Sequence, residues 1–446
     1  MSRTLNNKKK LIFISDESME CLYKNIDKDV YILPSITEGN CVYYSPQKDS
    51  SFEFSSCYLG DVINFYENSA LPQDSTLKDY LLSIEEESVA CPFEMKEIDT
   101  EDRAVILLTQ KCNLACSYCF AQSSRSKDVL PLDKVYAVVD HMFSFNNNKS
   151  KAFSFLGGGE PLICWNTIQR AAEYIQQKSK EMHIPYRLSV VTNATLLTEE
   201  KVKWIAQHGV IVSVSSDILP DIQNAQRPYA FKKDYSFDHV DLAIKLLLKY
   251  HVPFKLRATI TDMNVKRMQE MVDFVHNNYP SLKVMHLEPV TDSAEDYEAF
   301  YSQYVENFFA AYKLGQCFGI KVTNSLYSSF YHIKQHFCQG ELCVTPSGDI
   351  VSCHRHSSTN DEYYDACRYG VVNGKVQIDR ELLRNVITMR QQRIVDCNEC
   401  FAKWHCAGGC ASQKMVFTKE QQLSFCNYVR TFIRNLLELE IKNNNQ

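Results

Sequence analysis

The chain has 446 residues, with 45% hydrophobic side chains, 23% charged side chains and a net charge of −6. This length predicts roughly three domains, and the negative charge excludes a general nucleic-acid-binding protein, which would need a basic domain. No apolar segment is long enough for a signal-peptide core or a membrane span, so we expect a cytoplasmic protein without a membrane partner. In the reducing cytosol, the 18 cysteines are expected to be metal ligands rather than disulfides.

The predicted elements fall into three segments. Residues 1–98 should form strands at 10–15, 30–33 and 41–45 and then helices at 58–67 and 76–87, an α+β order. Residues 99–314 alternate six strands with six helices, the pattern of βα units around a parallel sheet. We place these strands at 104–108, 152–156, 187–192, 210–214, 254–260 and 283–287, and the helices at 132–143, 166–180, 198–208, 237–250, 264–278 and 296–313. The α/β pattern predicts a partial (β/α)6 barrel, with its site at the carboxyl ends of the strands.

Three cysteines, Cys112, Cys116 and Cys119, follow the first barrel strand with the spacing C-x3-C-x2-C. A [4Fe–4S] cluster normally takes four cysteines, so three thiolates in one loop leave one iron open to an external ligand. Short cysteine spacings also bind zinc, and a zinc knuckle or three unrelated buried thiols is the alternative. The loop resembles that of the radical S-adenosylmethionine (SAM) enzymes. The resemblance implies that these cysteines hold the catalytic cluster, that SAM binds its open iron, and that one electron cleaves SAM to a 5′-deoxyadenosyl radical.

A glycine-rich turn, Gly157-Gly158-Gly159-Glu160, follows the second barrel strand and begins 38 residues past Cys119. A glycine run alone can serve any tight turn. Its place after the cysteine loop, however, resembles the turn with which this family binds the amino group of SAM. The resemblance implies that Gly158, Gly159 and Glu160 help to bind SAM.

The end of the third strand is similar to a further SAM-binding segment of the family. Thr192-Asn193-Ala194 resembles Thr-Asn-Gly, with Ala194 in place of glycine, and implies that Asn193 lies at the site.

The end of the fourth strand, Ser215 to Ile218, resembles the Ser-x-Asp-Gly segment that lies near the ribose and carboxylate of SAM, with Ile218 in place of glycine. Arg227 matches the arginine that follows this segment. A turn serine and a surface arginine are the alternative interpretations of Ser215 and Arg227. Arg257 on the fifth strand is either a pocket charge or a residue of the barrel rim.

The last third of the chain carries a second cysteine pattern, C-x9-G-x4-C followed by C-x2-C-x5-C-x3-C and a final cysteine. This pattern resembles the SPASM extension, which holds two auxiliary [4Fe–4S] clusters. The resemblance implies three clusters in total, with zinc in one auxiliary site as an alternative. The first auxiliary cluster would be held by Cys338, Cys343, Cys353 and Cys410, and the second by Cys397, Cys400, Cys406 and Cys426.

The remaining cysteines are expected to be buried structural thiols, because a free cysteine behaves as a small hydrophobic residue. Cys367 lies between auxiliary ligands and could be an alternative ligand or a packed side chain. His354 and His356 flank Cys353, where a proton-transfer role competes with a surface or supporting role. The expected structural thiols are Cys21, Cys41, Cys57, Cys91, Cys164 and Cys317.

The element order of residues 1–98 resembles the winged-helix peptide-recognition domain of enzymes that modify ribosomally made peptides. Such a domain binds a leader peptide as an added β-strand, and a plain structural extension is the alternative. The three predicted domains are therefore a peptide-recognition domain at 1–98, a radical SAM partial barrel at 99–314 and a SPASM domain at 315–446.

These resemblances imply a peptide maturase that removes a hydrogen atom from a precursor peptide and forms a thioether or carbon–carbon cross-link. An auxiliary cluster would accept an electron, and flavodoxin or ferredoxin would supply the low-potential electron. The main alternative is an anaerobic sulfatase-maturating enzyme, but Ala121 and His354 replace the tyrosine and aspartate of that group. A non-catalytic iron–sulfur electron-transfer or scaffold protein would need neither the glycine turn nor a barrel.

Overall fold

The computed structural model describes residues 21–89, 98–122, 125–147, 149–291, 294–392 and 397–444. Its N-terminal part is a four-stranded antiparallel sheet in the order β1-β2-β3-β4, followed by two helices. The predicted strand at 10–15 lies outside the described residues. The other predicted strands and both helices are confirmed, whereas the short β1 and the polar β4 were not predicted. The bounds are β1 Tyr23–Asn25, β2 Val30–Pro34, β3 Asn40–Ser45, β4 Ser50–Ser55, α1 Leu59–Asn68 and α2 Ser75–Glu86.

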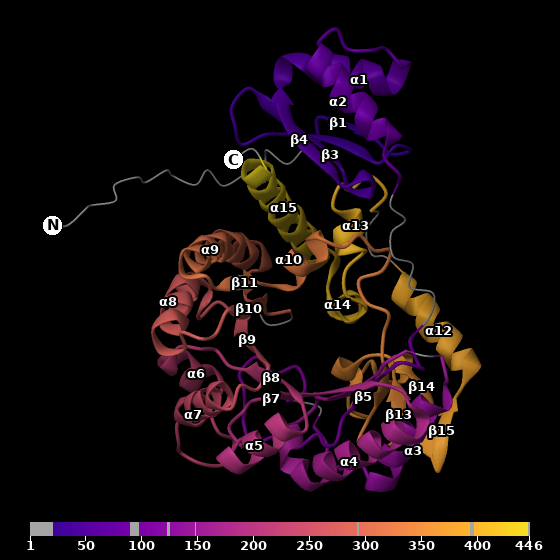
Figure 1. Cartoon of the computed structure of the whole chain (residues 1–446), viewed down its shortest axis with the longest axis vertical. Helices are drawn as coiled ribbons and strands as arrows, with labels where there is room; N and C mark the ends of the chain where they lie inside the picture. Colours follow the sequence, from indigo (N-terminus) through magenta and orange to yellow (C-terminus); the bar gives the residue numbers. More distant parts are fainter. Residues whose placement is uncertain are drawn as a thin grey trace, which may run out of the picture.

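The middle of the chain forms parallel strands that alternate with helices (Figure 1). All six predicted strands and all six predicted helices are present, and α6 is an additional short helix. The elements are β5 Arg103–Ile106, α3 Leu132–Ser144, β6 Lys151–Phe155, α4 Trp165–Met182, β7 Tyr186–Thr192, α5 Glu199–Gln207, β8 Ile211–Ser215, α6 Pro220–Gln226, α7 Ser236–Lys249, β9 Phe254–Ile260, α8 Met268–Asn278, β10 Val284–Pro289 and α9 Tyr297–Phe318.

The C-terminal part extends the same sheet at both edges. Strand β11 pairs in parallel with β10, and β12 pairs in parallel with β5 before β13, β14 and β15 continue as an antiparallel meander. The long helix α15 packs against α9 and lies between the barrel and the N-terminal sheet (Figure 1). The elements are β11 Lys321–Thr323, α10 Ser325–Phe330, β12 Leu342–Val344, β13 Asp349–Val351, α11 Tyr364–Cys367, β14 Arg368–Asn373, β15 Lys375–Ile378, α12 Arg380–Gln391, α13 Lys403–Cys406, α14 Ala411–Val416 and α15 Lys419–Asn444.

The two faces of the parallel strands differ in polarity. On β6 to β10, one face carries mainly apolar, buried side chains that belong to the core formed with the surrounding helices. The side chains between them are largely polar and remain partly exposed on the inner face, in contrast to the apolar interior of a closed α/β barrel. These inner-face residues include Ser154, Ser189, Ser213, Ser215, Lys255, Arg257, Thr259, His286 and Glu288.

Among the described residues, no helix is both long and apolar enough to span a membrane.

The N-terminal sheet is fastened to the cysteine-rich segment at 399–405. Asp29 is 2% exposed; its carboxylate accepts a 2.8 Å hydrogen bond from Trp404 Nε1 and lies 3.2 Å from Lys403 Nζ. Tyr44 on β3 donates its hydroxyl hydrogen to Nε2 of buried His405, whose Nδ1 donates to the Ser329 carbonyl. Burial lowers the pKa of His405 to about 4, so the ring is neutral at pH 7 and its Nε2 atom can accept the hydrogen bond from the tyrosine hydroxyl.

We expect the substitution Asp29→Asn to loosen this contact, because it removes the ion pair with Lys403 and weakens the bond to Trp404. The expected loss is about 2 kcal/mol of unfolding free energy, the range for hydrogen bonds to charged groups. Denaturant unfolding and amide exchange across 403–406 would measure it. Lys24→Gln is the matched control, since the Lys24–Glu399 pair is exposed to solvent and should contribute little to stability. Equal effects of the two substitutions would contradict the expectation.

Candidate radical SAM site

The three cysteines predicted to hold a catalytic cluster lie together in the loop that follows β5. Cys116 is buried, and Cys112 and Cys119 are half-buried. Burial raises the pKa of the Cys112 thiol and raises that of Cys116 to about 12. The charge of Cys119 adds to both rises, and that of Cys112 adds to the rise of Cys116, which requires the thiols to be close neighbours.

One arginine lies beside this thiol group. Arg125 Nη2 donates to Cys119 Sγ at 3.2 Å, and Nη1 donates to the Leu114 carbonyl at 3.1 Å. The Nε atom of Arg125 is buried without a hydrogen-bond partner among the described residues. Three thiols with an adjacent guanidinium form a donor set suited to an anionic iron–sulfur cluster, because thiolates are its ligands.

A site for a single metal ion differs from a cluster site in how closely its ligands must approach one point. Within the described ranges, no three His, Cys, Asp or Glu side chains are placed to hold one metal ion. A zinc ion needs its thiolate ligands within about 2.3 Å of one point, whereas the cysteines of a [4Fe–4S] cluster bind different irons.

The glycine turn packs directly onto the segment that leads into the cysteine loop. Gly159 N donates to Thr109 O at 3.1 Å, and Glu160 N donates to Lys111 O at 2.8 Å. A Cβ atom on Gly159 would lie 2.0 Å from Lys111 O, and one on Gly158, which has φ +63°, would lie 2.3 Å from the Gln110 side chain. At Gly159 the backbone of the neighbouring segment therefore excludes a side chain, whereas at Gly158 the left-handed backbone disfavours one.

Glu160 connects the glycine turn to the end of β7. Its carboxylate accepts hydrogen bonds from Leu162 N at 3.0 Å, Thr192 Oγ1 at 2.7 Å and Asn193 N at 2.8 Å. The side chain is 2% exposed, and burial raises its pKa against the opposing effect of these donors. Glu160 therefore holds the turn and Asn193 in place.

Asn193 lies beside the cysteine loop. Its Nδ2 atom donates to Asn113 Oδ1 at 2.9 Å and lies 3.9 Å from Cys112 Sγ. Asn113 Nδ2 in turn donates to Thr195 Oγ1 at 2.8 Å. The end of β7 thus supports the first cluster cysteine.

The two positions at which glycine is replaced both have a left-handed backbone. Ala194 has φ +63° and Ile218 has φ +69°, and both are buried. Left-handed backbone is unfavourable for residues with a Cβ atom, most of all for a β-branched one. Both segments thus keep the left-handed backbone that glycine adopts in the family pattern, although Ala194 and Ile218 are strained in this conformation.

We expect Ala194→Gly to relieve this strain and to stabilise the fold by about 0.5 to 1 kcal/mol, after the added flexibility of the unfolded chain is counted. The thermal midpoint of the purified protein would show a small rise. Ala206→Gly in helix α5 is the control, since glycine in a helix should lower stability by about 1 kcal/mol. A lower midpoint for Ala194→Gly would contradict the strain argument.

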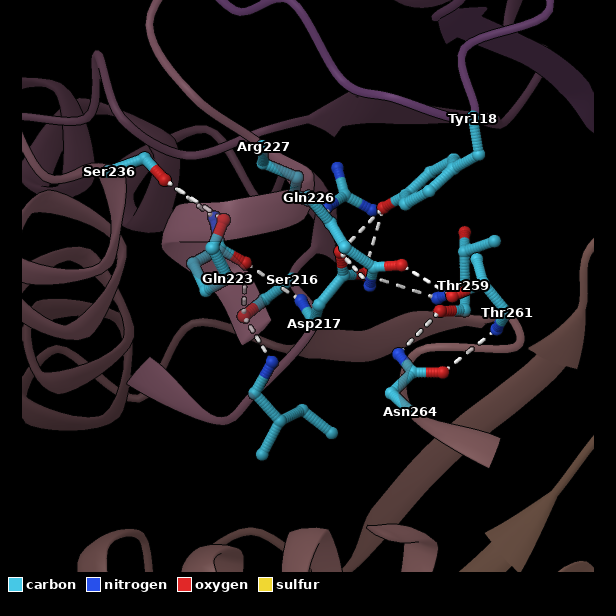
Figure 2. Close-up of polar contacts among 11 residues, drawn as sticks. Tyr118, Ser216, Asp217, Gln223, Gln226, Arg227, Ser236, Thr259, Thr261 and Asn264 are labelled. Carbon is cyan, nitrogen blue, oxygen red and sulfur yellow. Dashed lines mark hydrogen bonds and ion pairs between the residues drawn. The ribbon is translucent and has the colours of Figure 1, made fainter. Parts of the chain in front are cut away.

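Asp217, after β8, is the centre of a buried polar network (Figure 2). Both of its oxygens accept from the Tyr118 hydroxyl at 2.8 Å, and Oδ2 also lies 3.1 Å from Arg227 Nε and from Gln226 Nε2. Thr259 N, on the neighbouring strand β9, donates to Oδ1 at 3.3 Å. Tyr118 lies between Cys116 and Cys119, so the network ties the cysteine loop to the ends of β8 and β9.

Arg227 is 6% exposed, so the interpretation as a surface arginine is wrong. Its guanidinium lies 5.3 Å from the centre of the Tyr118 ring. Burial lowers its pKa, but the negative charge of Asp217 outweighs this effect and raises the pKa above its usual value. Ser215 does not join this network and faces the inner side of the barrel.

The predicted first auxiliary set is brought together around Arg390 on α12. Arg390 Nη2 donates to Cys338 Sγ at 2.6 Å and to Cys338 O at 3.3 Å. Burial lowers the arginine pKa, but the charges of Cys338, Cys353 and Cys410 raise it overall, so all three thiols are near the guanidinium.

Cys343 occupies a different part of this region. It is fully buried on β12 in a small core that also contains Cys367, Val105 and Val351. Burial raises its pKa most, and the charges of Cys353 and Cys367 add to the rise. The described structure therefore places both Cys343 and Cys367 next to Cys353.

The four predicted ligands of the second auxiliary cluster are close to one another. Burial raises the pKa of each thiol of Cys400, Cys406 and Cys426, and neighbouring thiol charges add to each rise. The charge of Cys397 contributes to the rise in pKa of all three thiols. Arg430 lies near and lowers the pKa of Cys400 and Cys426.

The expectation that the other cysteines are buried is only partly correct. Cys41 is buried, whereas Cys21 and Cys164 are half-buried. Cys57 and Cys317 are exposed, so a buried role for these two is wrong. Cys91 lies outside the described residues.

The two histidines after Cys353 have different surroundings. His356 is 5% exposed and bonds Asp361 at 2.9 Å and Ser412 Oγ at 2.8 Å, which is a structural role inside the fold. His354 donates from its backbone N and from Nδ1 to the Glu341 carboxylate, at 3.0 and 2.9 Å.

His354 also reaches the candidate SAM site. A Cβ atom on Gly157 would lie 3.6 Å from the His354 side chain, and the Phe120 ring centre lies 6.1 Å from that of His354. Burial would raise the pKa of Glu341, but His354 and Arg103 lower it to about 2. Glu341 therefore holds the histidine as a carboxylate, and no motif in the sequence indicated this contact.

The middle of the chain, residues 106–275, matches the family model described as Radical SAM superfamily. The chain is 23% identical to a cysteine-type anaerobic sulfatase-maturating enzyme of Clostridium novyi, across 69% of this chain and 86% of the relative. It is also 23% identical to the radical SAM cyclopropyl synthase TigE of Paramaledivibacter caminithermalis, across 75% and 74%. The match to an uncharacterized protein of Methanocaldococcus jannaschii, 28% identical, spans 59% of that protein and 40% of this chain.

Solved structures show the same fold. Native anSMEcpe with bound AdoMet superposes with a TM-score of 0.63 and 18% identity, covering 77% of this chain and 100% of that chain. Streptococcus suis SuiB bound to precursor peptide SuiA has a TM-score of 0.50 and 13% identity, covering 88% of this chain and 96% of SuiB.

Proposed function

We propose that this chain, a radical SAM enzyme related to sulfatase-maturating and peptide-modifying enzymes, matures a ribosomally made precursor peptide by forming a thioether or carbon–carbon cross-link. The cluster and SAM would supply a 5′-deoxyadenosyl radical that removes a hydrogen atom from the peptide. The protein's part is to hold these groups, orient the peptide and keep the reaction away from water.

The residues for the catalytic cofactors are Cys112, Cys116 and Cys119 for the cluster, with Arg125 neutralising part of the thiolate charge. The backbone of Gly158 and Gly159 would face the SAM amino group, and Glu160 would act by holding this turn.

Peptide capture is assigned to the N-terminal sheet. Its outer strands, β1 and β4, are the two edges at which an extended peptide could add as a further strand. SuiB, which is seen with its precursor peptide, covers 88% of this chain, whereas anSMEcpe covers 77%. The observation that carries the proposal is the docking of this sheet onto 399–405, which joins the proposed peptide-binding unit to the cysteine-rich segment.

The two auxiliary thiol groups would hold two further [4Fe–4S] clusters, so that oxidation of the substrate has an electron acceptor inside the protein. A flavodoxin or ferredoxin would reduce the enzyme. The close grouping of Cys397, Cys400, Cys406 and Cys426 supports the second of these sites.

Sulfatase maturation is the second candidate, favoured by the relative from Clostridium novyi, 86% of which aligns with this chain. It would convert a cysteine or serine of a sulfatase to formylglycine. At the two positions that distinguish that group, this chain has Ala121, which is buried, and His354, which is held by Glu341.

The test is mass spectrometry of small peptides encoded beside this gene, after anaerobic incubation with SAM, dithionite and the iron-loaded protein. A loss of two hydrogens per modified site, with 5′-deoxyadenosine formed in proportion, is expected. A sulfatase peptide converted to an aldehyde, with the neighbouring peptides unchanged, would replace the proposal by the second candidate.

A further inference from the structure

One cation beside the cysteine loop has no carboxylate partner. Arg125 lies six residues past Cys119, and its Nη2 atom donates to Cys119 Sγ at 3.2 Å. Its Nη1 atom donates to the Leu114 carbonyl at 3.1 Å, so the guanidinium holds two points of the loop. Within the part of the chain that the structure describes, no Asp or Glu forms an ion pair with Arg125. Its positive charge therefore acts on the thiols without compensation.

Arg227, the other arginine near these thiols, is in the opposite situation. Its Nε atom lies 3.1 Å from Asp217 Oδ2. Both charges reach Cys116: burial raises the pKa of this thiol most, Arg227 lowers it and Asp217 raises it. The opposing effects mean that this pair adds little net charge to the thiol group, whereas Arg125 adds a cation.

The thiols also differ in the hydrogen bonds that they receive. Cys112 Sγ lies 3.5 Å from Leu114 N and 3.9 Å from Asn193 Nδ2, which are neutral donors. Cys119 receives its hydrogen bond from a charged group, and such bonds are about twice as strong as neutral ones. The effect of Arg125 extends to Cys112, whose pKa it lowers against the larger effect of burial.

The charge of this region changes when an iron–sulfur cluster is reduced. One electron from a donor makes the cluster and its thiolates more negative by one charge, and the donor loses that electron. A nearby cation stabilises the more negative state, and hydrogen bonds to the sulfurs are among the factors that set the reduction potential of a cluster. Arginine is not deprotonated in proteins, so Arg125 acts as a fixed charge and supplies no proton.

We propose that Arg125 raises the reduction potential of the catalytic cluster through its hydrogen bond to Cys119, and so makes the cluster reducible by a low-potential electron-transfer protein. Arg125 is a positioning residue, because it acts through a thiolate that binds iron. The inference rests on the part of the proposed function that assigns this cluster to Cys112, Cys116 and Cys119. It does not depend on the peptide substrate.

The other two thiol groups have arginines of their own, which provides an internal control. Arg390 donates to Cys338 Sγ at 2.6 Å, and Arg430 lowers the pKa of Cys400, although burial raises this pKa more strongly. A substitution at Arg125 should therefore change the potential of the catalytic cluster and leave the potentials of any auxiliary clusters unchanged.

The test compares Arg125→Gln and Arg125→Lys with the control Lys127→Gln, which removes an exposed cation two residues further along the chain. The iron-loaded proteins are first matched for iron content and thermal midpoint. Each protein is then titrated with dithionite against redox dyes and followed by electron paramagnetic resonance. The signal of the catalytic cluster is the one that SAM changes and that Cys116→Ser lacks.

In Arg125→Gln, the ratio of reduced to oxidised catalytic cluster at a fixed potential is expected to fall about tenfold, because a charge-assisted hydrogen bond is lost. A tenfold change corresponds to about 59 mV for one electron. Arg125→Lys should show a smaller fall, since lysine keeps the charge but not the planar geometry. Lys127→Gln should change nothing, because solvent and salt screen an exposed charge.

An unchanged potential in Arg125→Gln overturns the proposal, as does an equal shift in Lys127→Gln or in every cluster of the protein. If Arg125→Gln does not retain the catalytic cluster, Arg125→Lys decides: a lower potential supports the proposal and an unchanged one overturns it. A wild-type spectrum that SAM does not alter overturns the cluster assignment and this inference together. Wild-type protein that responds to SAM but modifies no precursor contradicts only the peptide proposal, and the Arg125 comparison still decides the inference.

Discussion

Cys116→Ser is expected to reduce SAM cleavage to the uncatalysed background. Cys116 is the most buried of the three loop thiols, and serine does not provide the thiolate that an iron–sulfur cluster takes as ligand. Formation of 5′-deoxyadenosine under dithionite would be followed by chromatography, and the effect of SAM on the electron paramagnetic resonance spectrum of the reduced protein should vanish.

The matched control is Cys317→Ser, which changes an exposed thiol on α9. It should leave both readouts unchanged. The Cys116 variant should lose only the iron of one cluster, because the auxiliary thiols are held by other parts of the chain. Loss of all iron would instead show that the loop is needed for folding, and unchanged SAM cleavage would exclude these cysteines as the catalytic ligands.

The barrel could be predicted because its signals are local. Each strand of the βα units is a short apolar run, and each helix has an apolar face with the period of a helix. The additions to the sheet had no such signal: β12 has three residues and pairs with β5, more than 230 residues earlier in the chain. Its partner is determined by tertiary packing, which a local pattern does not contain.

The site shows the same division. The family resemblances that predicted the cysteine groups and the glycine turn rest on residues that are close in sequence. The arginines beside the thiols, Arg125 and Arg390, carry no spacing signal, and Arg390 reaches Cys338 across 52 residues. Cys317 was expected to be buried because a free cysteine behaves as a small hydrophobic residue, but its position on α9 leaves it exposed.

Asp217→Asn is the second substitution with a large expected effect. The carboxylate is fully buried, and it is the partner of Tyr118, Gln226, Thr259 N and Arg227 (Figure 2). Asparagine keeps the size but removes the charge, and its amide group would face other donors. Removing one partner of a buried pair leaves the other uncompensated, at a cost of about 3 to 5 kcal/mol.

The effect should reach the cysteine loop as well as stability. Tyr118 donates to Asp217, and burial together with the nearby carboxylate keeps the pKa of this tyrosine well above its usual value despite Arg227, so the hydroxyl remains a donor. With asparagine, the Tyr118 contact weakens, and Cys116 and Cys119 on either side lose their support. Iron should therefore be released faster to a chelator, alongside a lower denaturation midpoint.

The double variant Asp217→Asn/Arg227→Gln separates charge from geometry. It removes both charges, so it should recover part of the stability lost in the single variant, because a neutral buried pair avoids the uncompensated cation. Asp221→Asn on α6 is the control, since its pair with Arg267 is exposed and should be worth less than about 1 kcal/mol. A double variant no more stable than Asp217→Asn would show that the hydrogen-bond geometry around Asp217, rather than its charge, supports the cysteine loop.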